Sequence, residues 1–198
     1  MGAAATADDL DELRKLLLRR AVTHGDFVLS SGRRSSYYID CRLATMSAEG
    51  MIRIGRLGLS AIQQQGWKPA AVGGLTMGAD PVAYAIAAAS YGGSGGPEAV
   101  IDAFSVRKQA KEHGTGRLIE GNFSAGRAVV VVEDVITSGG SALTAIAAVE
   151  TAGATVLGVI AVVDREQGGR AKLEGQGRVV VTLTTAGELG LGQSNTGT

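Results

Sequence analysis

Four consecutive valines, Val129 to Val132, constrain the fold more than any other feature of this chain. A strand with one face in water alternates apolar and polar residues, whereas this run is apolar without interruption. Such a run is typical of a strand that is buried on both faces in a parallel sheet. Because parallel strands need crossover connections, usually helices, the run predicts an α/β fold.

Acids, hydroxyls and glycines follow the valines in an order that suits a phosphorylated sugar. Glu133 and Asp134 can accept hydrogen bonds from vicinal ribose hydroxyls or hold a hard cation such as Mg²⁺. The glycines of the next loop let backbone N–H groups approach an anion, and the alanine-rich helix that follows, with Gly153 placed to end it, adds unpaired donors at its start. Ligands of open parallel sheets bind at this corner, although an acidic strand end with a serine N-cap is an alternative explanation.

Residues 129–141 resemble the phosphoribosyl pyrophosphate (PRPP) signature of the type I phosphoribosyltransferases, in which apolar residues precede two acids, two apolar residues and a Thr-x-Gly-like loop. Ser138-Gly139 is a mild variation on that pattern. A Walker loop would need Gly-Lys-Ser/Thr, and a dinucleotide fingerprint would place its glycines before the acid. The resemblance implies that PRPP is bound by the residues after the valines, with Asp134 also catalytic: Glu133, Asp134, Val135, Ile136, Thr137, Ser138, Gly139, Gly140 and Ser141.

A basic stretch precedes this unit along the chain. Its cationic and titratable side chains fall within eleven positions and are Arg107, Lys108, Lys111, His113 and Arg117. A solvated charged loop is the usual explanation for such a run, but here flanking glycines permit movement and the cations match a diphosphate.

The spacing of this stretch resembles the mobile catalytic loop of the orotate phosphoribosyltransferases, Arg-Lys-x-x-Lys-x-His-Gly. The resemblance implies that Arg107, Lys108, Lys111 and His113 are catalytic and contact PRPP. It also implies a mobile loop over about residues 107–117 that closes over the neighbouring subunit's site, and hence a homodimer.

Two weaker matches indicate the same family. Residues 31–40, SGRRSSYYID, resemble a family segment whose paired aromatics, here Tyr37 and Tyr38, border the pyrimidine and the phosphate. Asp164-Arg165 resembles the Asp-Arg pair whose arginine recognises the orotate carboxylate, and a guanidinium can bind a carboxylate through two parallel hydrogen bonds. The resemblance adds Thr137 to the orotate contacts. Strand packing for the tyrosines and a surface position for the arginine are the alternatives.

The chain also departs from the family. Ser30 and Met77 stand where many members carry a lysine, so two cationic contacts to substrate are absent or supplied differently. The resemblance further implies a strained or cis peptide in the loop from Gly74 to Met77.

Composition excludes several functional classes. Lysine plus arginine equals aspartate plus glutamate at 19 each, so no global field recruits nucleic acid or an anionic membrane. Cys41 is the only cysteine, which excludes an internal disulfide and fits a reducing compartment. No apolar run approaches the roughly 20 residues of a membrane span, and no leader pattern is present at the N-terminus, so a cytoplasmic protein is expected.

The rest of the chain predicts one domain over residues 1–198, with tails at about 1–7 and 191–198. A helix capped by Asp8 or Asp9 precedes a hairpin around a Ser-Gly turn, and a second helix runs from Ser47 to Gly66. A further helix begins at Asp80-Pro81. Further strands are expected at 70–73, 99–106, 155–163 and 179–184. This order predicts the type I phosphoribosyltransferase fold, a central, mainly parallel sheet flanked by helices with a small N-terminal hood.

By this resemblance the expected activity is transfer of the 5-phosphoribosyl group from Mg²⁺-bound PRPP to orotate in pyrimidine (UMP) synthesis. Mg²⁺ would be held mainly by PRPP, with Asp134 as a contact through water. Two rivals stay open at this point. One is a phosphoribosyltransferase for another base, and the other is a PRPP-sensing regulator that binds nucleic acid without catalysis.

Overall fold

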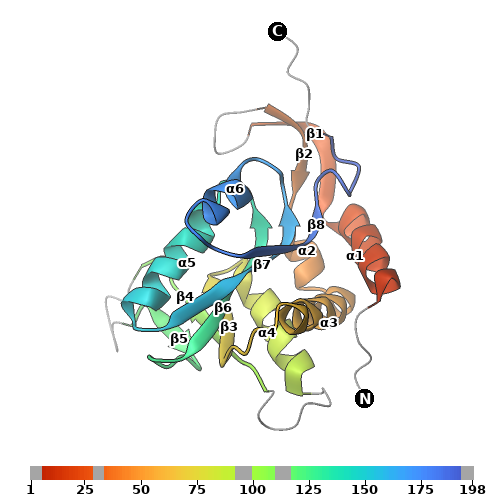
Figure 1. The fold of residues 1–198 in the computed structure, drawn as a ribbon. Coiled ribbons are helices and arrows are strands. Elements are labelled where there is room, and N and C mark those ends of the chain that lie inside the picture. Colours follow the sequence, from red (N-terminus) through yellow and green to blue (C-terminus); the bar gives the residue numbers. More distant parts are fainter. Residues whose placement is uncertain (1–5, 29–33, 92–99, 110–116, 193–198) are drawn as a thin grey trace.

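The computed structural model describes residues 6–28, 34–91, 100–109 and 117–192. Strand and helix alternate from β3 to β8 apart from β5, as the sequence predicted, and Figure 1 shows a central sheet between layers of helices. The elements, in chain order, are α1 (Ala7–Arg20), β1 (Val22–Val28), β2 (Arg34–Ile39), α2 (Arg42–Thr45), α3 (Ala48–Gln64), β3 (Ala71–Leu75), α4 (Ala79–Tyr91), β4 (Asp102–Val106), β5 (Ile119–Gly121), β6 (Ala128–Ile136), α5 (Gly140–Thr151), β7 (Thr155–Asp164), α6 (Gly169–Glu174) and β8 (Val180–Thr185).

The main sheet of the described residues has six strands in the order β5-β4-β3-β6-β7-β8. Neighbouring strands run parallel except for β5, which pairs antiparallel with β4 at one edge. β6, the valine strand, lies inside the sheet between β3 and β7. The prediction of a mainly parallel sheet is therefore confirmed, and the carboxyl ends of β3, β4, β6 and β7 meet along one edge.

The valine run is buried on both faces, as predicted. Val130 and Val132 join a core with side chains of α1, α3 and α4, whereas Val129 and Val131 join a second core with side chains of α5. Each of the four is at most 1% exposed. Because successive side chains of a strand point to opposite faces, an uninterrupted apolar run serves both cores at once. β6 is thus fixed from two sides, and its carboxyl end is a rigid place for functional groups.

The predicted N-terminal hairpin is present as a two-stranded sheet. β1 and β2 pair antiparallel, with a register shift between His24 and Phe27, and Figure 1 shows them above the main sheet as a small hood. The Ser-Gly turn between them lies outside the described residues. Val22 begins β1 opposite Ile39.

Most helix ends follow their expected signals. The Ser47 side chain caps α3 by accepting a hydrogen bond from Gly50 N at 3.0 Å. Gly66 and Gly153 directly follow the C-cap residues of α3 and α5. Both glycines have positive φ, as glycines just after a helix C-terminus commonly do. The cap of α1 differs from the prediction, because Thr6 is the N-cap and Asp9 completes a reciprocal capping box with it.

The short elements were predicted less well. At the described chain ends, Ala7 is the first residue of α1 and Leu191 is buried. α2, β5 and α6 were not predicted, since elements of three to six residues are too short to show a period. Among the described helices, none combines the length and apolar character that crossing a membrane requires.

Candidate active site

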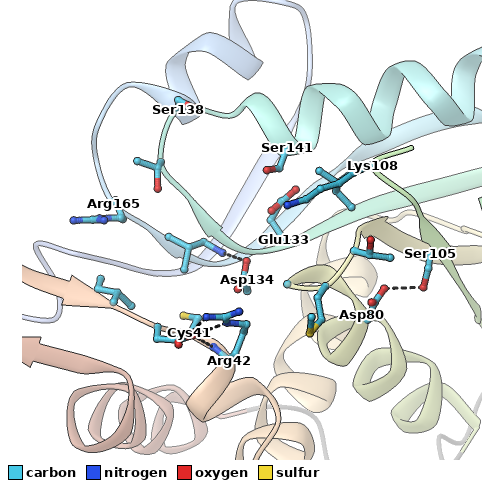
Figure 2. A pocket seen from close by; sticks show the side chains of 18 of the residues that line it. Cys41, Arg42, Asp80, Ser105, Lys108, Glu133, Asp134, Ser138, Ser141 and Arg165 are labelled. Carbon is cyan, nitrogen blue, oxygen red and sulfur yellow. Dashed lines mark hydrogen bonds and ion pairs between the residues drawn. The ribbon is translucent and has the colours of Figure 1, made fainter. Parts of the chain in front are cut away.

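A cleft of about 1330 Å³ opens at the carboxyl edge of the sheet. Its walls come from segments far apart in sequence, including the end of the hood and the ends of β3, β4, β6 and β7. Figure 2 shows Arg165 at one end of this cleft, Asp80 and Ser105 at the other, and Glu133 and Asp134 between them. Segments from the whole chain therefore converge on the corner that the sequence singled out.

The two acids at the end of β6 both line the cleft. Glu133 is only 5% exposed, and burial together with the neighbouring Asp134 raises its pKa to about 8. Burial also raises the pKa of Asp134, although a hydrogen bond from Val135 N at 2.8 Å to Oδ1 acts in the opposite direction. A Cβ atom at Gly78 would lie 2.5 Å from Asp134 Oδ1, so only glycine fits against this carboxyl group. The protein thus keeps two poorly solvated acids at the centre of the cleft.

The hydroxyl and glycine loop after β6 leads directly into α5. Thr137, Ser138 and Ser141 line the cleft. Gly139 is the N-cap of α5 with φ 74°, and no side chain of the described residues caps this helix start, so the serine-cap alternative is wrong. The first N–H groups of α5 are thereby left for an anion, the usual property of such a start. Of the other predicted PRPP residues, Val135 lines the cleft, whereas Ile136 is buried in the core under α5.

Arg165 follows β7 and is a buried cation, not the surface residue of the alternative interpretation. It is 5% exposed and lines the cleft, and its Nε and Nη2 are buried without a hydrogen-bond partner among the described residues. Its guanidinium carbon lies 5.2 Å from the centre of the Tyr37 ring, a cation–π contact. Because a buried cation without an acceptor is costly, this end of the cleft favours a ligand with negative charge.

The paired tyrosines of β2 divide their roles. Tyr37 is 5% exposed and lies behind Arg165, while Tyr38 is 43% exposed and lines the cleft. The Tyr38 ring packs on Phe27 of β1, with ring centres 5.7 Å apart. Neighbouring residues of a strand point to opposite faces, so only one of the two can face a ligand directly.

The basic stretch contributes two described residues to the cleft. Arg107 and Lys108 both line it, and Figure 2 shows the Lys108 side chain extending into it. Arg107 Nη1 lies 3.5 Å from Glu120 Oε1 of β5. Lys111 and His113 lie outside the described residues.

Sequence reasoning missed two polar pairs of this cleft. Arg42 binds Asp40 through Nε at 2.8 Å and Nη2 at 2.9 Å, and Ser105 Oγ donates to Asp80 Oδ1 at 2.7 Å. Asp80 was expected only as a helix cap, but α4 begins one residue earlier. The Ser105–Asp80 pair joins segments 25 residues apart, whereas Asp40 and Arg42 are only two residues apart, and the local pattern gives no distinctive signal that either pair lines the cleft.

The loop after β3 also reaches the cleft. The peptide bond between Thr76 and Met77 is cis, as the resemblance implied for this loop, and both residues line the cleft. Met77 places an apolar side chain there. Within the described ranges, no group of three or more His, Cys, Asp or Glu side chains is arranged to hold a metal ion.

Comparison with known proteins gives consistent matches over almost the whole chain. The family described as "Phosphoribosyl transferase domain" matches residues 47–184. The orotate phosphoribosyltransferase of Mycobacterium avium is 48% identical over 184 residues, which are 93% of this chain and 98% of that protein. The corresponding protein of Rhodopirellula baltica is 40% identical over 195 residues, 96% of this chain and 99% of its own.

A solved structure shares this fold together with a ligand. It is the Mycobacterium tuberculosis orotate phosphoribosyltransferase in complex with PRPP, which is 42% identical in sequence. The match has a TM-score of 0.75 and covers 92% of this chain and 99% of that one.

Proposed function

This chain belongs to the orotate phosphoribosyltransferases within the phosphoribosyl transferase domain family, and we propose that its cleft joins orotate to Mg²⁺-bound PRPP. The products are orotidine 5′-phosphate and pyrophosphate, in pyrimidine (UMP) synthesis. One observation carries the proposal for the site: a buried acid, a half-buried acid and a buried arginine lie at the ends of the adjacent parallel strands β6 and β7, and two nitrogens of the arginine have no hydrogen-bond partner among the described residues. A ribose bearing a phosphate and a base bearing a carboxylate together supply the partners that these groups require.

The PRPP half of the site is assigned to the end of β6 and the loop after it. Glu133 and Asp134 accept hydrogen bonds from the ribose hydroxyls. Thr137, Ser138 and Ser141 donate to the 5′-phosphate, together with the N–H groups at Gly139 and Gly140 at the start of α5. Val135 and Ile136 hold this segment against its neighbours.

The orotate half is assigned to Arg165 and the hood. The Arg165 guanidinium binds the orotate carboxylate through charge-assisted hydrogen bonds. Tyr37 packs against that guanidinium, Tyr38 borders the pyrimidine from the cleft wall, and Thr137 adds a hydroxyl between the two halves.

The basic stretch supplies the charge that the leaving group needs. Arg107 and Lys108 line the cleft, and the sequence pattern assigns Lys111 and His113 to the same loop. These side chains offset the negative charge that develops on the diphosphate, with His113 as donor or loop anchor. Preorganised charge of this kind lowers the barrier more than it strengthens ground-state binding.

The reaction exchanges one bond at C1 of the ribose. The C1–O bond to the diphosphate breaks and its electron pair leaves with pyrophosphate, while positive charge grows on the ribosyl ring. N1 of orotate forms the new bond to C1 and gives up its proton, which pyrophosphate or water accepts. No covalent intermediate with the protein is required. The cleft therefore acts by aligning the two reactants, stabilising the leaving group and excluding water.

Mg²⁺ fits this site as a companion of PRPP. The described residues offer the oxygens of Glu133 and Asp134 but no larger cluster of ligands, which suits an ion that keeps several waters and the diphosphate oxygens. Asp134 would contact it through water, and the ion would neutralise diphosphate charge.

A homodimer with loops acting across its interface completes the proposal. Two inactive variants test it, Lys111→Ala in the loop and Asp134→Asn in the cleft. After subunit exchange, each mixed dimer would hold one intact site served by an intact loop, so about a quarter of wild-type activity should return. No recovery after verified exchange would contradict action across the interface.

The function is tested by following orotate absorbance with PRPP and Mg²⁺, beside parallel assays with uracil, adenine, guanine and xanthine. We expect Mg²⁺-dependent consumption of orotate alone. Turnover of another base in place of orotate would overturn the Arg165 assignment. Silence with every base, together with retention on nucleic acid at low salt, would favour the regulatory alternative.

A further inference from the structure

Glu166, the residue directly after Arg165, has an unusual backbone conformation. Its φ is 56°, and it is the one non-glycine residue with positive φ in the described part of the chain. A residue with a Cβ atom adopts this left-handed region only at a cost in conformational free energy. Its surroundings must therefore hold it there.

Two hydrogen bonds hold Glu166 from opposite sides. Its N–H donates to Asp164 Oδ1 at 2.8 Å, which ties it to the end of β7. Its side chain reaches the loop after β8, where Oε2 accepts a hydrogen bond from Gly187 N at 2.6 Å. The carboxylate thus joins the turn after β7 to the turn after β8.

The donor at Gly187 is itself fixed in place. Ala186, just before it, is buried, and its N–H donates to Asp164 O at 2.8 Å. Leu191 N in turn donates to Ala186 O at 2.9 Å. A Cβ atom at Gly187 would lie 2.9 Å from Glu166 Oε2, so a larger residue would push the carboxylate away.

Arg165 is the residue that these contacts bracket. Its N–H donates to Ile136 O at 2.9 Å, and its guanidinium rests on Tyr37. The backbone of β6 thus fixes Arg165 on one side, and the bond from Glu166 to Gly187 fixes the next residue on the other. The direction in which the Arg165 side chain leaves the backbone depends on both.

We propose that Glu166 is a positioning residue for orotate: by binding Gly187 N–H it holds the turn that aims the Arg165 guanidinium at the orotate carboxylate. Glu166 itself need not touch the substrate. The inference rests on the proposed role of Arg165 and extends it to a residue that the family signature does not include.

Three substitutions separate the carboxylate contact from the backbone conformation. Glu166→Asn keeps a residue type that tolerates positive φ but is too short to reach Gly187. Glu166→Gly removes the side chain and the conformational cost together, so it tests the contact even if the asparagine variant folds poorly. Glu166→Gln keeps the length of the side chain and an acceptor oxygen, so it should keep the contact with Gly187. Glu174→Gln is the matched control, since Glu174 pairs with Arg170 on α6 at 2.8 Å and does not line the cleft.

The readout is the KM for each substrate, with folding verified by thermal unfolding. We expect the asparagine and glycine variants to raise the KM for orotate about tenfold, the scale for losing one charge-assisted contact that orients a binding group. The KM for PRPP should stay near wild type, and Glu166→Gln and Glu174→Gln should remain near wild type for both substrates.

Arg165→Met, assayed in parallel, distinguishes a failure of the role proposed for Glu166 from a failure of the role proposed for Arg165. If it raises the KM for orotate while the folded Glu166 variants do not, the positioning role is overturned and the role of Arg165 stands. If Arg165→Met leaves the KM for orotate unchanged, the assignment of Arg165 fails and the inference fails with it. Equal rises in both KM values for the Glu166 variants would also overturn it, because a general structural defect would act on both substrates.

Discussion

The ends of β6 and β7 are neighbours in the sheet, yet they place different side chains in the cleft: Glu133 and Asp134 from β6, and Arg165 from the residue after β7. The two strands pair up to Ile136 and Asp164, where both strands end. The β6 corner, defined as Glu133 to Ser141, presents the buried Glu133 and the half-buried Asp134. The β7 corner, defined as Asp164 to Glu166, presents a buried guanidinium with two nitrogens that have no partner among the described residues.

This difference shows how one sheet edge can be divided between two ligands. An ion pair between the corners would have relieved the cost of burying both, but it would also have occupied both half-sites. Burial instead raises the pKa of Glu133 to about 8 and leaves Arg165 in need of an anion. In the proposed site, each corner then takes one class of partner, hydroxyls and a cation at β6 and a carboxylate at β7.

The largest effect should come from the β6 corner. Asp134→Asn removes the charge that we propose contacts the ribosyl group, while keeping the shape of the side chain. We expect kcat/KM for PRPP to fall about 10³-fold, near the upper end for loss of one preorganised electrostatic group. Steady-state kinetics with both substrates varied would measure this, and the KM for orotate should change little. A fall in kcat/KM for orotate alone would exchange the roles assigned to the two corners.

Loss of a loop cation should lower turnover and leave substrate binding at both corners unchanged. Lys111→Ala removes charge that would offset the leaving diphosphate, and we expect kcat to fall by about 10² or more. Single-turnover measurements at saturating substrates report this directly. Turnover within a few-fold of wild type would contradict the loop assignment. A rise in the KM for orotate alone would instead assign Lys111 to the β7 corner.

At the β7 corner the effect should be smaller and restricted to the base. Arg165→Met keeps much of the side-chain volume and removes the charge. We expect the KM for orotate to rise about 30-fold, the scale of one charge-assisted hydrogen-bonding group, with the KM for PRPP close to wild type. Competition assays with uracil sharpen the comparison, since the variant should lose its preference for the carboxylated base.

The smallest effect should appear as a pH dependence of the β6 corner. The pKa of Glu133 is about 8 in the unliganded protein, against an ordinary value of 4.5, so its proton must leave before it can accept from two ribose hydroxyls. Because PRPP binds the ionised form of Glu133 in this account, its affinity should rise as the pH rises through 8, by about tenfold between pH 7 and 9. The same linkage lowers the stability of the unliganded fold as the pH rises from about 4.5 to 8, because the folded state holds this proton more tightly than the unfolded chain.

Glu133→Gln is the control for both readouts. It should flatten the slope of PRPP affinity against pH, measured by titration calorimetry, and it should remove this contribution to the stability profile in chemical denaturation. A wild-type affinity that falls between pH 7 and 9, or a slope that persists in the glutamine variant, would contradict the account.

The sequence predicted the β6 corner best because its signals are local. The valine run, the two acids and the glycines are contiguous, and their order alone implies strand, corner and helix start. The different positions of Tyr37 and Tyr38 were harder to predict. Their spacing predicts opposite faces, but only the contact of the hood with the residue after β7 decides which face meets Arg165.

The contacts that complete the site could not be predicted because they join distant segments. Ser105 binds Asp80 across two elements, and Glu166 binds Gly187 across the turns after β7 and β8. The positive φ of Glu166 had no signal either, since glutamate is not a residue that usually marks such a position. Short polar pairings of this kind depend on the assembled fold and not on any local pattern.

A crystal structure of the protein with orotidine 5′-phosphate would test the division of the sheet edge most directly, because this one molecule carries all three groups that the corners are assigned to bind. The account predicts the carboxylate against the guanidinium of Arg165, the ribose hydroxyls against Glu133 and Asp134, and the 5′-phosphate within residues 137–141. A carboxylate bound by another cation, or ribose hydroxyls that contact neither acid, would contradict it.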